Sequence, residues 1–242
     1  DGVSPNLEIY SSVIDVLVRR NKDVEAMKYF EEMKSQGIFP KVTTYLALIE
    51  VLLRKNKDEE VIRYLEEMKR KGVYPNTITY TSLISLLMKR NKYDKAMQYF
   101  EEMKREGISP DIMTYNTLIS DLLKRNKDEE AMNYFEEMKS EGVSPNTVTY
   151  NILIDVLLKR NKDEKAMKYF EEMISNNILP NSVTYSLFLN TLFNRDQVHS
   201  ALALFNSLKS KSLPPDSGVY AVMVNGLYES GEKEKAKKLC QK

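Results

Sequence analysis

The sequence of 242 residues contains one cysteine, one histidine and no tryptophan. A single cysteine, Cys240, cannot build an internal disulfide framework, and it cannot supply the several thiolates of a structural zinc site. No apolar run approaches the roughly 18 residues that a membrane span needs, and no signal or transit segment is recognisable. The formal charge of only +1 argues, at first sight, against a nucleic-acid partner.

Residues typical of catalytic and metal sites are equally scarce. The only histidine, His199, falls at a position expected to be exposed, early in a helix. The sequence has no His-x-Glu with a Cys-x-x-Cys, the zinc signature of nucleobase deaminases, and no carboxylate cluster typical of a nuclease. We therefore expect a protein that is not an enzyme, with no metal, no cofactor, no small-molecule substrate and no membrane partner.

Repetition is what the sequence has in abundance. A tyrosine recurs every 35 residues from Tyr10 to Tyr220, and a proline keeps the same step from Pro5 to Pro215. Such constant spacing is what a stack of identical structural units requires. With the residue after each proline counted as position 35, the full repeats are 7–41, 42–76, 77–111, 112–146, 147–181 and 182–216, followed by a partial repeat at 217–242. We expect a single array over 1–242, which begins inside the tail of an earlier repeat.

Each repeat has the pattern of two helices. In repeat 5, apolar residues recur at i, i+3, i+4, i+7 and i+8 from Tyr150 to Leu158, which indicates an amphipathic first helix, helix A. Asn161 is expected to stop it in a left-handed conformation, and Asp163 is expected to cap a second helix, helix B, of about twelve residues. Neither helix can bury its apolar stripe alone. The sequence therefore predicts an all-α solenoid of 35-residue helix-turn-helix repeats.

Charge is separated between the two helices. Positions 2, 5, 9 and 13 of helix A lie on the face opposite the apolar stripe. Position 13 is basic in the first five repeats, as Arg19, Arg54, Lys89, Lys124 and Lys159. Helix B instead repeats a pair of glutamates. A net charge near zero is therefore compatible with a basic surface on the A helices that binds a polyanion. The alternative is that the basic residues only complement the helix dipole and that the glutamates only solvate an outer face.

The frame VTYN-x-LI, followed by L-x-KRNK-x-DEKAM-x-YFEEM and G-x-x-PN, resembles the P-type pentatricopeptide repeat over essentially the whole chain. The 35-residue step, the Thr-Tyr start of helix A and the absence of tryptophan distinguish it from the tetratricopeptide repeat. The resemblance implies a right-handed superhelix that binds single-stranded RNA along its A helices. Each repeat would read one base, with the N-terminal repeat toward the 5′ end. It also implies a role in organelle RNA processing, in a mitochondrion or plastid.

The same resemblance assigns three sets of RNA contacts. Position 2 is an apolar wedge between bases, here Ile78, Met113, Val148 and Val183. Positions 5 and 35 address the Watson–Crick edge, in the pairs Thr81 with Asp111, Asn116 with Asn146, Asn151 with Asn181, and Ser186 with Asp216. Position 13 meets phosphates through Lys89, Lys124 and Lys159. Repeat 6 has Asn194 at that position, with Arg195 adjacent.

The chemistry of positions 5 and 35 supports an order of bases. A carboxylate only accepts hydrogen bonds, so Asp at position 35 suits the ring N–H of guanine or uracil, whereas an Asn amide can donate to the bare ring nitrogen of cytosine or adenine. A short Thr or Ser at position 5 leaves room for a purine, and the longer Asn fills that space beside a pyrimidine. Repeats 3 to 6 then predict 5′-G-C-C-G-3′, with uracil tolerated at the two middle positions.

The end repeats depart from this pattern. Repeat 1 has Glu8 at position 2, repeat 2 has Leu46 at position 5 and repeat 7 has Glu229 at position 13. We expect these repeats to pack or cap the array, and their exposed surfaces allow a homodimer. Two other functions stay open: a solenoid that grips a peptide in the same groove, and an array that serves only as a scaffold. Asp or Asn after the proline can also be a helix cap and nothing more.

Overall fold

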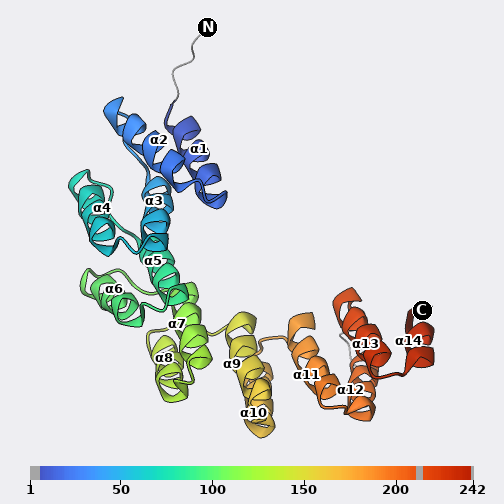
Figure 1. Cartoon of the computed structure of the whole chain (residues 1–242). Helices are drawn as coiled ribbons and strands as arrows, with labels where there is room; N and C mark the ends of the chain where they lie inside the picture. The colour runs from blue at the N-terminus through green and yellow to red at the C-terminus, as the bar shows by residue number, and fades with distance from the viewer. Residues whose placement is uncertain (1–5, 211–214, 241–242) are drawn as a thin grey trace. The chain divides into compact units, whose positions relative to one another are not determined.

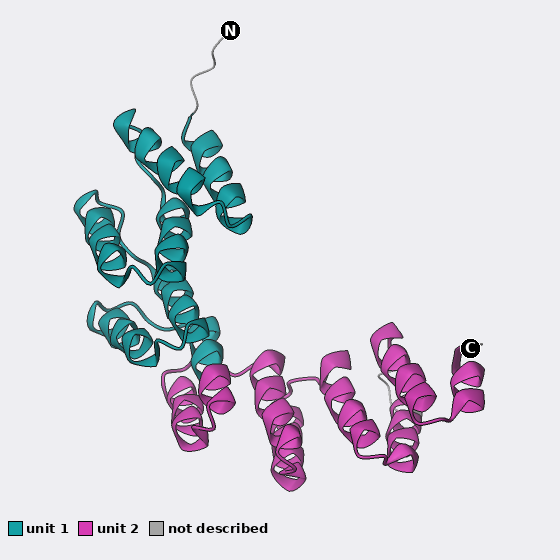
Figure 2. Cartoon of the chain, in the orientation of Figure 1, with its two compact units in different colours: residues 1–118 teal, residues 119–242 magenta. Residues whose placement is uncertain are grey.

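The structure is a computed structural model, and it describes residues 6–210 and 215–240. Residues 1–5, 211–214 and 241–242, which include Pro5 and parts of the expected sixth and seventh repeats, lie outside the described residues. Two compact units cover residues 1–118 and 119–242 (Figure 2). The boundary between the two units falls inside the helix Ile112–Lys124, α7.

The described residues form fourteen α-helices and no strand (Figure 1). The A helices begin 35 residues apart: α1 (Leu7–Arg19), α3 (Val42–Arg54), α5 (Thr77–Lys89), α7 (Ile112–Lys124), α9 (Thr147–Lys159), α11 (Ser182–Asn194) and α13 (Ser217–Glu229). The B helices are α2 (Asp23–Ser35), α4 (Asp58–Arg70), α6 (Tyr93–Arg105), α8 (Asp128–Ser140), α10 (Asp163–Ser175), α12 (Val198–Ser210) and α14 (Lys233–Cys240). The expected alternation of A and B helices is therefore confirmed.

An asparagine in the left-handed conformation ends each of the first five A helices. The residues are Asn21, Asn56, Asn91, Asn126 and Asn161, all with φ between 55° and 61°. Asparagine tolerates this region better than most residues that carry a Cβ atom. The prediction made for Asn161 is confirmed, and the tight stop allows helix B to begin two residues later.

The two kinds of helix begin differently. Before α9, the Asn146 side chain accepts the Thr149 amide, and the Thr149 hydroxyl is bonded to the Asn146 backbone amide, which together make a capping box. The prediction that Asp163 caps helix B is wrong, because Asp163 is the first residue of α10 and the cap residue, Lys162, makes no side-chain cap bond. The carboxylate of Asp163 instead forms an ion pair with Arg195.

The core repeats with the sequence. The Tyr, Leu and Ile stripe of helix A is buried together with Ala, Phe and Met side chains of helix B. In α2, α6, α8, α10 and α12, a Phe meets the helix A Tyr of the next repeat edge to face, as in Phe30 with Tyr45 at 5.6 Å and Phe205 with Tyr220 at 5.1 Å between ring centroids. Within unit 1, α3 packs on α1 and α5, and within unit 2, α11 packs on α9 and α13. Stacking therefore buries the stripe that no repeat could bury alone.

The second glutamate of the helix B pair serves the core as well as the surface. The Tyr80 hydroxyl donates to Glu102 at 2.9 Å, and the Tyr45 hydroxyl donates to Glu67 at 3.3 Å. Burial, with the nearby Glu67 carboxylate, raises the pKa of Tyr45 to about 12. These glutamates satisfy buried phenols, so they do more than solvate an outer face.

Candidate nucleic-acid interface

Four apolar side chains stand exposed in the first turns of successive A helices. Their exposed fractions are 66% for Ile78, 60% for Met113, 54% for Val148 and 54% for Val183. Each lies at position 2, next to the capping residue at position 35 of the preceding repeat. The core does not use these four side chains, and they recur at one position of helix A.

In unit 1, the structure brings the predicted pair Thr81 and Asp111 together through a third residue, Thr114. The Thr114 amide and hydroxyl both donate to Asp111 Oδ1 at 2.9 Å. The Thr81 and Thr114 hydroxyl oxygens lie 2.6 Å apart. Thr114 is fully buried, whereas Thr81 and Asp111 are half-buried. Asp111 therefore caps α7 through Oδ1, and its second carboxylate oxygen takes no part in the cap.

In unit 2, Asn151 and Asn181 form the matching arrangement. Asn151 Nδ2 donates to Asn181 Oδ1 at 3.4 Å, and the Thr184 amide donates to the same oxygen at 3.1 Å. The Thr184 hydroxyl donates to Asn151 Oδ1 at 2.7 Å. Because a backbone amide can only donate, the atom of Asn181 that faces it is oxygen, and the Nδ2 group points away from the helix.

The two residues predicted for repeat 4 lie in different units, Asn116 in unit 1 and Asn146 in unit 2. Asn146 accepts the Val148 amide at 2.9 Å and the Thr149 amide at 3.1 Å through Oδ1, so its Nδ2 group is also left over. Asn116 is only 6% exposed. Among the described residues, no hydrogen-bond partner meets its buried Oδ1, which makes Asn116 less accessible than the sequence pattern suggests.

Repeat 6 lacks the bridge seen in repeats 3 and 5. The Val219 amide donates to Asp216 Oδ1 at 3.0 Å, and that bond, with a second from the Ser182 hydroxyl, holds the pKa of Asp216 below its usual value. The residue that would bridge Asp216 to Ser186 is Val219 itself, which has no hydroxyl. Both predicted side chains are accessible, since Ser186 is half-buried and Asp216 is exposed.

The predicted phosphate lysines are exposed, but they are not equivalent. Lys89 and Lys124 lie at the exposed ends of α5 and α7. Lys159 has a side chain that is 71% exposed, yet its Nζ forms an ion pair with Asp155, one turn earlier in α9, at 2.6 Å. Ser85 and Ser120 occupy that place in repeats 3 and 4, so repeat 5 carries the most neutralised lysine of the three.

Two arginines at the ends of A helices, Arg54 at position 13 and Arg195 at the following position, make contacts within the fold. Arg54 binds Asp23 and donates to the Val18 carbonyl at 3.2 Å. Arg195 binds Asp163 and donates to the Leu158 carbonyl at 2.8 Å. Each guanidinium thereby closes the carboxyl end of the preceding repeat's helix A. Arg195, the basic residue adjacent to Asn194 in repeat 6, is therefore engaged in contacts within the fold.

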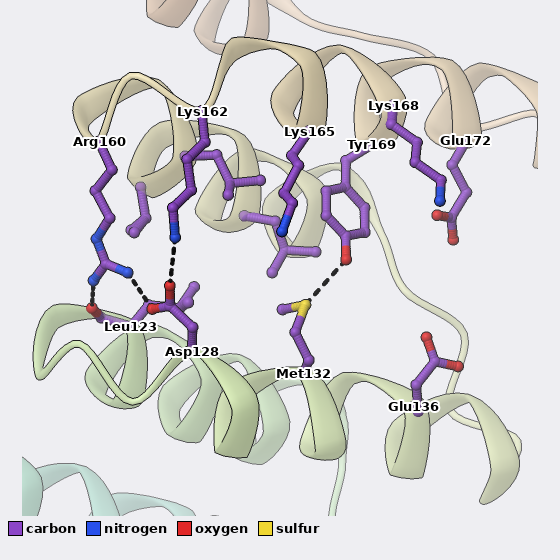
Figure 3. A pocket seen from close by; sticks show the side chains of 13 residues that line it. Leu123, Asp128, Met132, Glu136, Arg160, Lys162, Lys165, Lys168, Tyr169 and Glu172 are labelled. Carbon is purple, nitrogen blue, oxygen red and sulfur yellow. Dashed lines mark hydrogen bonds and ion pairs between the residues drawn. The ribbon is translucent and has the colours of Figure 1, made fainter.

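A pocket of about 360 Å³ lies between α8 and α10 in unit 2 (Figure 3). Arg160 and Lys162 bind Asp128 at one end, and the Tyr169 hydroxyl contacts Met132 Sδ at 3.0 Å in the middle. The Arg160 bond holds the pKa of Asp128 below its usual value. None of the predicted RNA-contact residues lines this pocket.

Other kinds of site find little support in the part of the chain that the structure describes. There, no helix is long and apolar enough to cross a membrane, and no group of three or more His, Cys, Asp or Glu could hold a metal ion. His199 is exposed, as expected. Cys240 is exposed as well.

The repeat frame, the stacked helix pairs and the recurring exposed positions define a helical-repeat protein of one family. A model of the PPR repeat family matches residues 5–52, 40–89, 75–124, 110–159 and 145–194. The chain belongs to the pentatricopeptide repeat family. No curated protein sequence matches it at a significant level.

Solved structures resemble the chain over nearly its whole length. The pentatricopeptide repeat protein PPR10 from maize is 28% identical, with a TM-score of 0.70 over 97% of this chain. This chain spans only 34% of the maize chain. PPR10 in complex with an 18-nucleotide psaJ RNA element is 22% identical, with a TM-score of 0.66 over 98% of this chain and 39% of that chain.

A third structure is the PPR domain of Arabidopsis thaliana protein-only RNase P 1 in complex with tRNA. It is 16% identical, with a TM-score of 0.54 over 81% of this chain and 98% of that chain. At these identities the likeness to the last two structures shows the fold alone. The expected class, an all-α solenoid of tandem repeats, is confirmed.

Proposed function

We propose that this protein binds single-stranded RNA and selects its sequence, with one base read by each of repeats 3 to 6. The observation that carries the proposal is the recurrence of an exposed apolar side chain beside a capping side chain that keeps one polar atom free. Apolar and aromatic faces stack on bases regardless of sequence, and hydrogen bonds to the Watson–Crick edge select among them. PPR10, whose structure from maize is 28% identical to this chain, has also been solved in complex with RNA, which supports the same partner.

Repeat 3 is suited to guanine. Asp111 uses Oδ1 for the Thr114 amide and hydroxyl, so the second carboxylate oxygen is the atom that can meet a base. A carboxylate oxygen only accepts, and guanine presents an N–H at the ring position of its Watson–Crick edge. The short Thr81 leaves room for the larger purine.

Repeat 5 is suited to cytosine. Asn181 turns its oxygen toward the Thr184 amide and presents Nδ2, which donates to the bare ring nitrogen of cytosine. Uracil carries an N–H at that ring position, and two facing donors repel. We therefore place cytosine ahead of uracil in repeat 5, and we extend this order to repeat 4, because Asn146 has the same capping bonds.

The proposed recognition element is thus 5′-G-C-C-G-3′, with the last guanine read by Ser186 and Asp216. Ile78, Met113, Val148 and Val183 act as wedges, and Lys89, Lys124 and Lys159 neutralise phosphates. Binding is the whole activity that we propose, without catalysis, and the RNA would be a transcript of a mitochondrion or plastid. We treat residues 1–242 as one RNA-binding array.

Selection from a randomised RNA pool tests this function. We expect enrichment of 5′-GCCG-3′ and steep loss of binding with added salt, because each neutralised phosphate releases counterions. Enrichment of an unrelated sequence would overturn the base assignments and leave RNA binding in place. If no RNA binds above the background of a charge-matched protein, the peptide-binding solenoid or the inert scaffold becomes the better description.

A further inference from the structure

In repeats 3 and 5, a buried threonine of the following repeat joins the two side chains that are proposed to read the base. In repeat 3 this residue is Thr114, which contacts Thr81 at 2.6 Å and Asp111 at 2.9 Å. In repeat 5 it is Thr184, which contacts Asn151 at 2.7 Å and Asn181 at 3.1 Å. Thr114 and Thr184 have no exposed surface, so neither can touch RNA itself.

The single proton of the threonine hydroxyl fixes which atoms of the reading pair are left for the base. In repeat 3 the carboxylate of Asp111 cannot donate, so Thr114 gives its proton to Asp111 and receives the proton of Thr81. Thr81 then turns an oxygen lone pair outward. The repeat therefore presents two acceptors, which match the ring N–H and the amino group of guanine.

In repeat 5 the corresponding hydroxyl, that of Thr184, leaves donors for the base, where repeat 3 leaves acceptors. Thr184 gives its proton to Asn151 Oδ1 at 2.7 Å, which commits that oxygen to the interior. One Asn151 Nδ2 hydrogen is bonded to Asn181 Oδ1, and the other is left to donate. With Asn181 Nδ2 also directed outward, the repeat presents donors, which match the ring nitrogen and carbonyl oxygen of cytosine. Without the bridge, only the longer bond from Asn151 Nδ2 to Asn181 Oδ1, at 3.4 Å, would hold the Asn151 amide in this orientation.

Two other repeats lack one part of this bridge. In repeat 6 the bridging position is Val219, which contributes only its backbone amide to Asp216. In repeat 2 the threonine is present as Thr79 and caps α5 through Asn76 at 3.0 Å, but position 5 is Leu46, which has no polar atom. Within one chain, repeats 3 and 5 therefore have the complete bridge, repeat 6 lacks the hydroxyl and repeat 2 lacks the polar side chain at position 5.

We infer that Thr114 and Thr184 are positioning residues that determine base specificity, so that repeats 3 and 5 each read a base with the help of the next repeat. The inference rests on the proposed RNA-binding function and refines it. It ranks the repeats, because the bridged repeats 3 and 5 discriminate sharply, whereas repeat 6, with Val219, discriminates weakly between guanine and other bases.

The test replaces the hydroxyl without changing the shape of the side chain. Affinities of the whole chain are measured by fluorescence anisotropy for four RNAs that differ only in the third base of 5′-GCCG-3′, the base of repeat 5. We expect Thr184→Val to reduce the preference for cytosine over uracil and adenine about tenfold, with the same salt dependence as the parent. Thr184→Ser keeps the hydroxyl and should keep the preference.

Two further variants separate positioning from helix capping. Thr79→Val removes the same cap contacts from α5, where no reading pair depends on them, and should leave the preference at every base unchanged. Val219→Thr installs the missing hydroxyl and should raise the preference for guanine at the fourth base about fivefold. This gain does not depend on whether the Thr184→Val protein folds.

The outcomes are distinguishable. A parent protein that binds all four RNAs equally would overturn both the proposed base reading and the inference. A parent that prefers cytosine, with an unchanged preference in Thr184→Val or no gain in Val219→Thr, would overturn the bridging role alone. A similar loss of preference in Thr79→Val would assign the effect to helix capping and would also overturn it.

Discussion

Asp155 and Lys159 form an ion pair one turn apart on the exposed surface of α9, with the lysine Nζ 2.6 Å from the carboxylate. The lysine is one of the three proposed phosphate contacts, so part of its charge is already balanced before RNA arrives. Repeats 3 and 4 carry serine in place of Asp155. If the three lysines contact phosphates as proposed, Lys159 should contribute less than Lys89 and Lys124.

Removal of that carboxylate should strengthen binding. We expect Asp155→Ser to increase affinity for every RNA about twofold to fivefold at low ionic strength and to steepen the dependence on salt. The matched control is Glu50→Ser, because its neighbour Arg54 is held by Asp23 and the Val18 carbonyl. Salt titrations of both variants check this, and equal gains would show that only the overall charge matters.

Replacement of Lys89, Lys124 and Lys159 by Gln together should weaken binding to all sequences about equally. Three lost phosphate contacts lower the slope of log affinity against log salt by about 2, at roughly 0.7 per contact for a single strand. The control variant changes Lys28, Lys165 and Lys168 of the B helices, which alters net charge by the same amount. If both variants show the same slope, the basic residues of the A helices are not the phosphate track.

Asn116→Thr should convert repeat 4 from cytosine to adenine. Asn146 still presents a donor to a bare ring nitrogen, and the shorter side chain admits a purine. We expect a change in discrimination of about 1–3 kcal/mol, measured with 5′-GCCG-3′ and 5′-GACG-3′ in identical flanks. Leu46→Thr should change this ratio little, and an unchanged ratio in Asn116→Thr contradicts the assignment of position 5.

Arg195→Gln should lower thermal stability without flattening the salt dependence of RNA binding. The variant loses the ion pair to Asp163 and the bond to the Leu158 carbonyl, and both join repeats 5 and 6. Thermal stability is measured by circular dichroism melting, and the salt dependence of RNA binding is measured by salt titration. A normal melting curve with a flatter salt slope would reassign Arg195 to phosphate binding.

Alkaline pH should destabilise the array through its buried tyrosines. The pKa of Tyr45 is raised from 10.0 to about 12, first by burial and then by Glu67. Because the neutral phenol is favoured in the folded protein, its stabilising contribution is complete below pH 10 and is lost as the pH rises toward 12. Melting temperatures across this range should fall less steeply for Tyr45→Phe than for the parent.

Much of the fold could be predicted because its signals are local. Helix periodicity, the left-handed stop at Asn161 and the constant 35-residue step need only neighbouring residues and a count. The exposure of Ile78 and Met113 could also be predicted from the sequence, since position 2 lies opposite the buried stripe of helix A. The resemblance to the pentatricopeptide repeat pointed to positions 5 and 35, but it did not reveal which of their atoms remain free.

The sequence by itself determined that the chain is an all-α repeat array of this family, because the same helix periodicity and the same helix-ending residues recur every 35 residues. Only the tertiary structure decided what single polar atoms do. Asp163 pairs with Arg195, 32 residues away, and Thr184 orients Asn151 across 33 residues. The physical reason is that each polar side-chain atom between stacked repeats has few hydrogen-bond partners within reach. The partner that it finds in the next repeat determines which atom of the side chain remains for a ligand.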